Sequence, residues 1–272
     1  MNHTPLRMRR ILHPDTGRAL LVTFTSSMEV GVAAGMADLA GTIGGLAESG
    51  LPTAVVVHAG VEKTLFARFP NLPCGTIVDL FGGTWMTTAP QRREQICSLE
   101  HAVRVGADAV LMTVALGSAD EASQLHLCGR IARECTAWGM PLVVRVDTTE
   151  TDARRQFSAT MSGHGARLAY ELGADMVIVN YSGDPGTFGE ALQGVDIPVL
   201  FGGAPNMATD EALLASIEES MSAGAAGIAL SASMFWTLMK FLYCISSPTS
   251  VSLVKAWTRS SFTGTLMSFS FW

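Results

Sequence analysis

The residues best suited to chemistry in this chain follow a short apolar run. Met176 to Val179 is the kind of run found in strands buried on both faces, and Asn180, Tyr181 and Asp184 come directly after it. In parallel α/β proteins, reactive side chains gather at the carboxyl ends of strands. We therefore expect this strand end to belong to a functional site, with Tyr181 as a proton donor and Asn180 as a substrate contact. An Asn at this position could also simply tie down a loop.

A second set of polar residues ends other apolar runs. Arg145 and Asp147 share one face of a predicted strand, because residues two apart point the same way. The guanidinium of Arg145 could clamp a carboxylate or a phosphate, and Asp147 could act as a base. His58 could protonate an enolate, and Asp79 could contact the substrate. The alternative is that Arg145 and Asp147 pair inside the fold and that His58 caps a strand end.

Two later strand ends could hold an anion. Gly202 and Gly203 end one predicted strand, and their backbone N–H groups could cradle a phosphate, as late loops of barrels often do. A tight turn explains the two glycines equally well. Ser231 ends the last predicted strand and is a further candidate for substrate binding.

The elements that would position these residues repeat along the chain. A glycine that ends a helix precedes a strand in several places, as Gly173 does before Met176. Eight strands alternate with helices, and the strands are predicted at 19–24, 53–58, 76–80, 109–113, 142–147, 176–179, 197–201 and 227–231. One helix is predicted from Arg92 to Val105. The count of eight predicts a closed (β/α)8 barrel. A doubly wound open sheet is the alternative, but no G-x-G-x-x-G follows the first strand.

Composition narrows the possible partners and cofactors. The net charge of -6 argues against a nucleic-acid partner. Five cysteines, an odd number, indicate buried reduced thiols in a cytoplasmic protein. The histidines are scattered and no C-x-x-C occurs, so we expect neither a metal nor another cofactor.

The C-terminal tail differs from the rest of the chain. After Glu219 no acidic residue occurs, and aromatic and apolar residues dominate. We assign residues 1–236 to the barrel and 237–272 to an atypical hydrophobic tail in place of the last barrel helix. A terminus of foreign origin is the other explanation. The apolar run from Ile228 to Ile245 is nearly long enough for a transmembrane helix, but its first part is already a predicted strand, so no membrane partner is expected.

Several segments resemble the archaeal-type class I fructose-bisphosphate aldolase family, within the superfamily of deoxyribose-phosphate and tagatose-bisphosphate aldolases. They are residues 9–17, 102–109, 134–142, 172–175, 180–184, 197–199 and 224–227. The resemblance covers about the first 235 residues. It implies a barrel, a small phosphorylated or carboxylated metabolite as substrate, and a ring-like homo-oligomer.

The resemblance fails at the catalytic positions. Members of the family form a Schiff base from a lysine on the sixth strand, and the corresponding residue here is Ile178. A Schiff base needs a primary amine with a lowered pKa, and the chain has three lysines, Lys63, Lys240 and Lys255. Lys63 follows the second strand and has the features of a surface lysine, and the other two lie in the tail.

Two functions remain. The first is a carbon–carbon lyase or related enolising enzyme that acts on a small oxo-acid or sugar phosphate without the usual lysine. The second is a catalytically inactive barrel that binds a metabolite or a partner. The loss of the family's catalytic lysine favours the inactive barrel, and the polar residues at the strand ends favour the enzyme.

Overall fold

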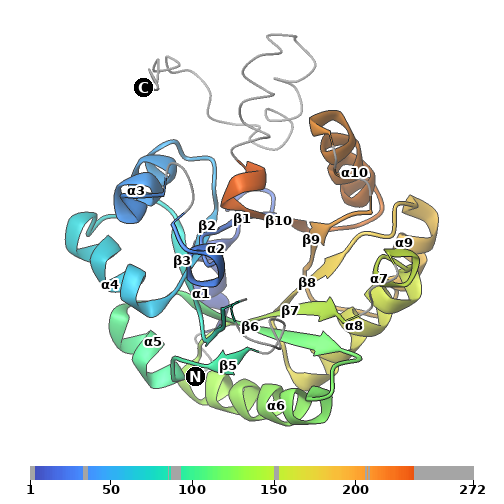
Figure 1. Cartoon of the computed structure of the whole chain (residues 1–272), viewed down its shortest axis with the longest axis horizontal. Coiled ribbons are helices and arrows are strands. Elements are labelled where there is room, and N and C mark those ends of the chain that lie inside the picture. Colours follow the sequence, from blue (N-terminus) through green and yellow to red (C-terminus); the bar gives the residue numbers. More distant parts are fainter. Residues whose placement is uncertain are drawn as a thin grey trace.

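A computed structural model describes residues 4–32, 36–84, 86, 93–149, 153–205, 207 and 209–235. Eight parallel strands close into a barrel in the order β1-β10-β9-β8-β7-β6-β3-β2. Figure 1 shows this ring of strands with helices arranged around its outside. The predicted (β/α)8 barrel is therefore confirmed, and the open sheet is excluded. The predicted tail, 237–272, lies outside the described residues, as does Asn206.

The barrel strands are β1 (Ala19–Thr23), β2 (Ala54–Val57), β3 (Gly75–Asp79), β6 (Ala109–Leu116), β7 (Leu142–Thr148), β8 (Met176–Asn180), β9 (Val199–Gly203) and β10 (Gly227–Ser231). The helices are α1 (Thr4–Ile11), α2 (Ser26–Val30), α3 (Leu39–Glu48), α4 (Ala59–Arg68), α5 (Leu99–Val105), α6 (Glu121–Trp138), α7 (Ala153–Gln156), α8 (Ala159–Leu172), α9 (Pro185–Ala191) and α10 (Asp210–Ser222). A small antiparallel pair, β4 (Phe81–Gly82) and β5 (Glu94–Gln95), follows β3.

Alternation along each strand divides the core into two layers. The inner cluster fills the barrel with residues such as Leu21, Ile77 and Ile178. The outer cluster packs the other faces of the same strands, including Val22 and Val177, against the helices. Successive strand residues point to opposite faces, so a sequence of continuous apolar runs produces a sheet that is buried on both sides.

The expected helix–glycine–strand punctuation is present. Gly106, Gly139 and Gly173 end α5, α6 and α8 in the left-handed conformation. Their N–H groups bond to carbonyls of the last helical turn, which removes unsatisfied acceptors at these helix ends.

The helix predicted from Arg92 to Val105 is wrong in its first half. Glu94 and Gln95 pair with β4, and α5 begins only at Leu99, after Ser98 caps it through the N–H of His101. Ile96 and Cys97 donate backbone hydrogen bonds to Leu80, so pairing with the end of β3 takes precedence over local helical spacing.

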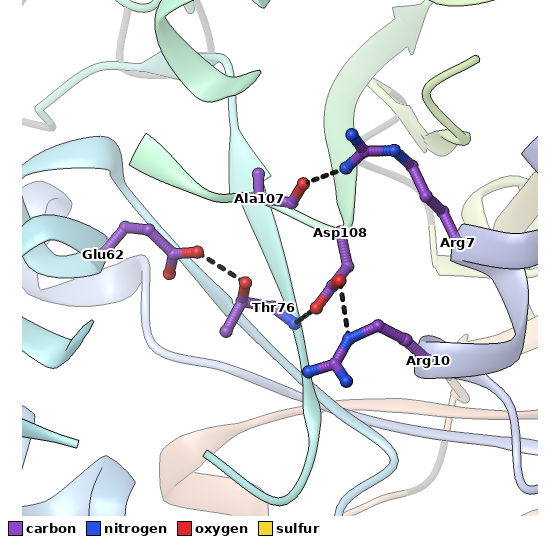
Figure 2. A network of polar contacts seen from close by, with 6 residues as sticks. All are labelled: Arg7, Arg10, Glu62, Thr76, Ala107 and Asp108. Atoms are coloured by element: carbon purple, nitrogen blue, oxygen red, sulfur yellow. Dashed lines mark hydrogen bonds and ion pairs between the residues drawn. The ribbon is translucent and has the colours of Figure 1, made fainter. Parts of the chain in front are cut away.

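The amino end of the barrel is tied to α1 by polar contacts (Figure 2). Arg10 binds Asp108 at 2.7 Å, and the other oxygen of Asp108 accepts a hydrogen bond from the backbone N–H of Thr76 at 3.0 Å. Arg7 donates to the carbonyl of Ala107 at 2.7 Å. The hydroxyl of Thr76 donates to Glu62, a fully buried residue of α4. This network joins α1, α4, β3 and the start of β6, and it leaves the opposite end of the barrel for a site.

Candidate active site

Polar side chains replace the apolar core at the carboxyl end of the barrel. The same alternation that places Ile77, Val143 and Ile178 inside places the polar residues two positions later on that face. The inward positions are those of His58, Asp79, Thr113, Arg145, Asp147, Asn180, Gly202 and Ser231. We call this group, together with Glu29 and Arg93, the barrel mouth. Most of the predicted site residues therefore come together at one end of the fold.

Arg145 and Asp147 form an ion pair on β7. Arg145 Nε donates to Asp147 Oδ1 at 3.0 Å, and the side chains are 32% and 35% exposed. Arg145 lies between Thr113 of β6 and Ile178 of β8 in the strand register. The negative charge of Asp147 raises the pKa of Arg145. The pairing expected as the structural alternative is present, but both groups keep a solvent-accessible face that a ligand could reach.

Asp79 is a nearly buried carboxyl, 3% exposed, at the end of β3. Burial raises its pKa to about 7, although the Phe81 N–H bonds it at 3.0 Å and the charges of Arg93 and Arg145 favour ionisation. Burial thus brings the pKa of this carboxyl close to neutral pH. Such a carboxyl can give or take a proton without a large energetic cost.

His58 lies beside Asp79 at the end of β2. Its Nδ1 is 3.4 Å from the backbone oxygen of Asp79, and its residue is 8% exposed. Burial lowers the pKa of His58, the carbonyl of Asp79 opposes this shift, and the charge of Arg93 lowers the pKa further. The imidazole is thus held mainly neutral at physiological pH, with one nitrogen turned to a strand end.

Glu29 and Arg93 complete the mouth, and our sequence analysis did not select either as a site residue. Glu29 belongs to α2, directly after β1, and Arg93 directly precedes β5. The two form an ion pair across 64 positions of sequence. The sequence offered one signal for Glu29, which is its position in the polar stretch after the first strand. It offered none for Arg93, whose position depends on the pairing of β4 with β5.

Ile178 occupies the inner face of β8 and is 1% exposed. Gly202 of β9 packs directly on it, since a Cβ at Gly202 would lie 2.7 Å from Ile178 Cγ2. A Cβ at Gly203 would lie 3.2 Å from the side-chain oxygen of Asn180. Close approach to β8 is thus one physical reason for two adjacent glycines here.

Tyr181, which we expected to protonate an enolate, points out of the barrel. It is fully buried in the outer layer, where its hydroxyl donates to Glu219 of α10 at 2.9 Å and its ring meets Phe188 edge-on. Burial and the carboxylate of Glu219 raise the pKa of Tyr181. Asn180 takes the inward position at this strand end, so Tyr181, one residue later, faces the helices.

Ser231 ends β10 and lies close to Ser233, with 3.0 Å between their hydroxyl oxygens. Its hydroxyl also accepts from the N–H of Met234 at 3.3 Å, which ties it to the following turn. Within the described part of the chain, no three His, Cys, Asp or Glu side chains are placed to hold a metal ion. No helix among the described residues is long and apolar enough to cross a membrane.

A separate small cavity of ≈ 230 Å³ lies between α3 and the segment from Arg68 to Pro73. This segment leads from α4 into β3, so the cavity is near the amino end of the strands. Four cysteines, Cys74, Cys97, Cys128 and Cys135, are buried and free, as expected for reduced thiols. None of them faces the barrel mouth.

Comparison with known proteins places this architecture among aldolases. The pattern of the DeoC/LacD family aldolases matches residues 14–235. The 2-amino-3,7-dideoxy-D-threo-hept-6-ulosonate synthase 1 of Archaeoglobus fulgidus is 32% identical over 188 residues, 67% of this chain and 67% of that protein. The 2-amino-4,5-dihydroxy-6-oxo-7-(phosphonooxy)heptanoate synthase of Streptomyces griseus is 28% identical over 234 residues, 85% and 83% of the two chains.

A solved structure shares the fold over nearly its whole length. It is an archaeal fructose-1,6-bisphosphate aldolase with its catalytic lysine covalently bound to the carbinolamine intermediate of the substrate. The TM-score is 0.75 at 26% identity, covering 94% of this chain and 98% of that one.

Proposed function

Because this chain belongs to the DeoC/LacD aldolase family, we propose that it is a carbon–carbon lyase or related enolising enzyme that works without the Schiff-base lysine. The family resemblance inferred from the sequence is thereby confirmed. The carboxyl end of a (β/α)8 barrel is where such enzymes carry their reactive groups. The observation that carries the proposal is the grouping of Arg145, Asp147, Asp79 and His58 at that end.

The proposed loss of the amine follows from the lysine inventory. The chain has three lysines, of which Lys63 is exposed on α4 and Lys240 and Lys255 lie outside the described residues. The resemblance places the family's lysine at Ile178, which is buried against Gly202. An alkyl side chain cannot attack a ketone, so the carbonyl would be activated by charge and hydrogen bonding instead.

In the proposed reaction, Arg145 binds the carbonyl oxygen or the neighbouring anionic group of the substrate. Asp147 accepts the proton of the hydroxyl group β to the carbonyl as the carbon–carbon bond breaks. The electron pair of that bond moves to the carbonyl oxygen, and the resulting enolate is stabilised by the guanidinium of Arg145. Protonation of the enolate carbon by Asp79 then completes the cleavage, and His58, whose lowered pKa keeps it mainly neutral, is the poorer proton donor.

The proposed substrate is a small phosphorylated sugar or oxo-acid. The Streptomyces relative is named for a phosphonooxy heptanoate, and the structural relative is a bisphosphate aldolase, which supports a phosphate on the substrate. We assign the contacts to this group to Gly202, Gly203, Asn180 and Ser231, whose backbone N–H groups and polar side chains end β8, β9 and β10.

Substitution of Arg145 and Asp147 tests the proposal. Arg145→Ala should weaken binding of an anionic substrate roughly ten- to hundredfold, because a hydrogen bond to a charged group contributes about 1.5–3 kcal/mol. Asp147→Asn should leave binding nearly unchanged and remove turnover, since an amide keeps the shape but cannot accept the proton. Affinity by calorimetry and melting temperature should be measured on both variants. Unchanged affinity in Arg145→Ala would refute the site.

The second candidate is a metabolite-binding barrel without catalysis. The mutual pairing of Arg145 and Asp147 favours it, because a pair satisfied inside the barrel needs no substrate. It predicts that both substitutions lower the melting temperature, because each breaks a partly buried pair. It also predicts that a bound ligand leaves the protein chemically unchanged. A melting shift with sugar phosphates in the absence of products would favour this candidate.

A further inference from the structure

The ion pair between Glu29 and Arg93 joins two segments that border the barrel mouth. Glu29 comes from α2 after β1, and Arg93 precedes β5. Their side chains are 30% and 27% exposed, so the pair is neither a freely solvated surface contact nor a sealed one. An incoming ligand can reach both partners from the solvent.

The charges of this pair act on the groups inside the mouth. Arg93 lowers the pKa of both His58 and Asp79, and Glu29 raises the pKa of both. Glu29 also contributes to the raised pKa of Arg145. Glu29 follows β1, and Arg93 precedes β5, which pairs with β4 just beyond the end of β3. The pair therefore stands at the carboxyl end of the strands, beside the barrel mouth.

The described part of the mouth holds two guanidinium groups, and each is already neutralised by a carboxylate. Arg145 pairs with Asp147 and Arg93 pairs with Glu29. A phosphate entering the mouth thus meets no unpaired positive charge among these residues. Arg145 holds Asp147 through Nε and keeps its two terminal nitrogens for a ligand, whereas Arg93 holds Glu29 through a terminal nitrogen. A phosphate therefore gains a two-donor contact with this end of Arg93 only by replacing Glu29.

Such an exchange discriminates between kinds of anion. A substrate carboxylate that replaces Glu29 trades one singly charged partner for another, so the gain is small. A phosphate monoester carries a charge of about −1.5 to −2 at neutral pH and more acceptor oxygens, and a guanidinium matches its geometry with two parallel donors. Displacing Glu29 costs the same free energy for either anion, so the competition weakens both, and the intrinsic preference of Arg93 for phosphate is unchanged.

We propose that Arg93 is a phosphate-binding residue of the barrel mouth and that Glu29 is its internal competitor, displaced when a phosphorylated ligand binds. This inference rests on the proposed function for the nature of the ligand. The phosphate contact at Arg93 is additional to the backbone contacts assigned to β9 and β10. Glu29 sets the affinity that an anion needs at Arg93, since the anion must outcompete its carboxylate to take its place.

The proposal makes opposite predictions for the two partners. Arg93→Ala should weaken binding of inorganic phosphate about tenfold or more, through loss of charge-assisted hydrogen bonds. Glu29→Gln should tighten it roughly two- to fivefold, which is the range expected when a partly exposed ion pair no longer competes. The double variant should bind nearly as weakly as Arg93→Ala alone, because the competition by Glu29 is exerted through Arg93.

Calorimetric titration of the full chain with inorganic phosphate, and with acetate as a singly charged comparison, measures these effects. Glu100→Gln is the matched control, since Glu100 pairs with Arg104 on the exposed face of α5 and should leave phosphate binding unchanged. Both anions should bind more tightly in Glu29→Gln, and the preference for phosphate over acetate should be retained. Glu29→Ala replaces the Gln variant if the latter does not fold.

Weaker or unchanged phosphate binding in a folded Glu29 variant would overturn the proposal and leave the pair as a structural link between α2 and β5. Absence of phosphate binding to the wild-type chain would overturn it as well. The titrations need no turnover, so a failure here is distinct from a failure of the proposed lyase activity, which Arg145→Ala and Asp147→Asn report.

Discussion

Replacing Glu62 by Gln should change how the stability of the barrel depends on pH. Glu62 is fully buried between α4 and β3, where one oxygen accepts from the hydroxyl of Thr76 and the other has no hydrogen-bond partner (Figure 2). Burial raises its pKa from 4.5 to about 7, the bond from Thr76 opposes the shift, and the charge of Asp108 adds to it. Between these two pKa values, the folded protein therefore keeps a proton on Glu62 that the unfolded chain has already released.

The sign and size follow from this difference in proton binding. Between the unfolded pKa of 4.5 and the folded pKa of about 7, the native protein binds one more proton than the unfolded chain. The free energy of unfolding must then fall as pH rises through this window, by about 1.4 kcal/mol per unit. Ionisation of Glu62 lowers the free energy of unfolding by about 3 kcal/mol in total, and this decrease is complete once the pH is above the folded pKa.

Glu62→Gln removes this proton but keeps the size of the side chain. The amide nitrogen replaces an oxygen that has no partner, which costs stability at every pH, so only the pH-dependent part is diagnostic. Urea unfolding at about pH 5 and about pH 8 should show that the variant gains about 2 to 3 kcal/mol relative to wild type between the two conditions. Glu48→Gln, at an exposed position on α3, should show no such gain.

Asp79 contributes a similar slope, because burial also raises its pKa to about 7. Subtracting the variant from wild type isolates Glu62, since Asp79 is present in both. Parallel stability curves for wild type and Glu62→Gln, within about 0.5 kcal/mol across the range, would refute the argument. They would mean that Glu62 is ionised in the folded protein and that its unpaired oxygen finds a partner.

Two further predictions concern the barrel interior. Incubation with dihydroxyacetone phosphate followed by borohydride should give no covalent adduct on residues 1–235, and a mass shift at Lys63 would show that an amine on α4 has taken over the chemistry. Gly202→Ala should destabilise the barrel by about 1–3 kcal/mol, because its Cβ would lie 2.7 Å from Ile178 Cγ2. In an Ile178→Ala background, which lacks Cγ2, Gly202→Ala should cost less in thermal unfolding, and an equal cost would contradict the steric explanation.

The architecture was predictable because its signals are local. Helix-ending glycines, short apolar runs and polar strand ends each depend on a few neighbouring residues, and the eight strands fall within a few positions of their predicted ranges. Alternation placed Arg145 and Asp147 on one face of β7, as predicted, and that face points into the barrel, as Ile178 of β8 does. The helix expected from Arg92 to Val105 failed because Glu94 and Gln95 pair with β4 instead, a contact that no local pattern encodes.

The sequence did not predict the orientation of Tyr181, because the contact that decides it joins distant segments. Tyr181 stands among polar residues, and only the inward position of Asn180 and the presence of Glu219 on α10 show that it faces the helices.

The sequence by itself determined the fold class, the family and the absence of a lysine from residues 64–239, because strand periodicity, motif residues and composition are properties of the chain alone. Tertiary structure decided which polar residues share the barrel mouth and which carboxyls stay protonated. Glu29 and Arg93 meet across 64 positions, and Glu62 owes its raised pKa to its burial between α4 and β3. Burial and charge depend on what surrounds a group in space, and those neighbours exist only after the barrel closes.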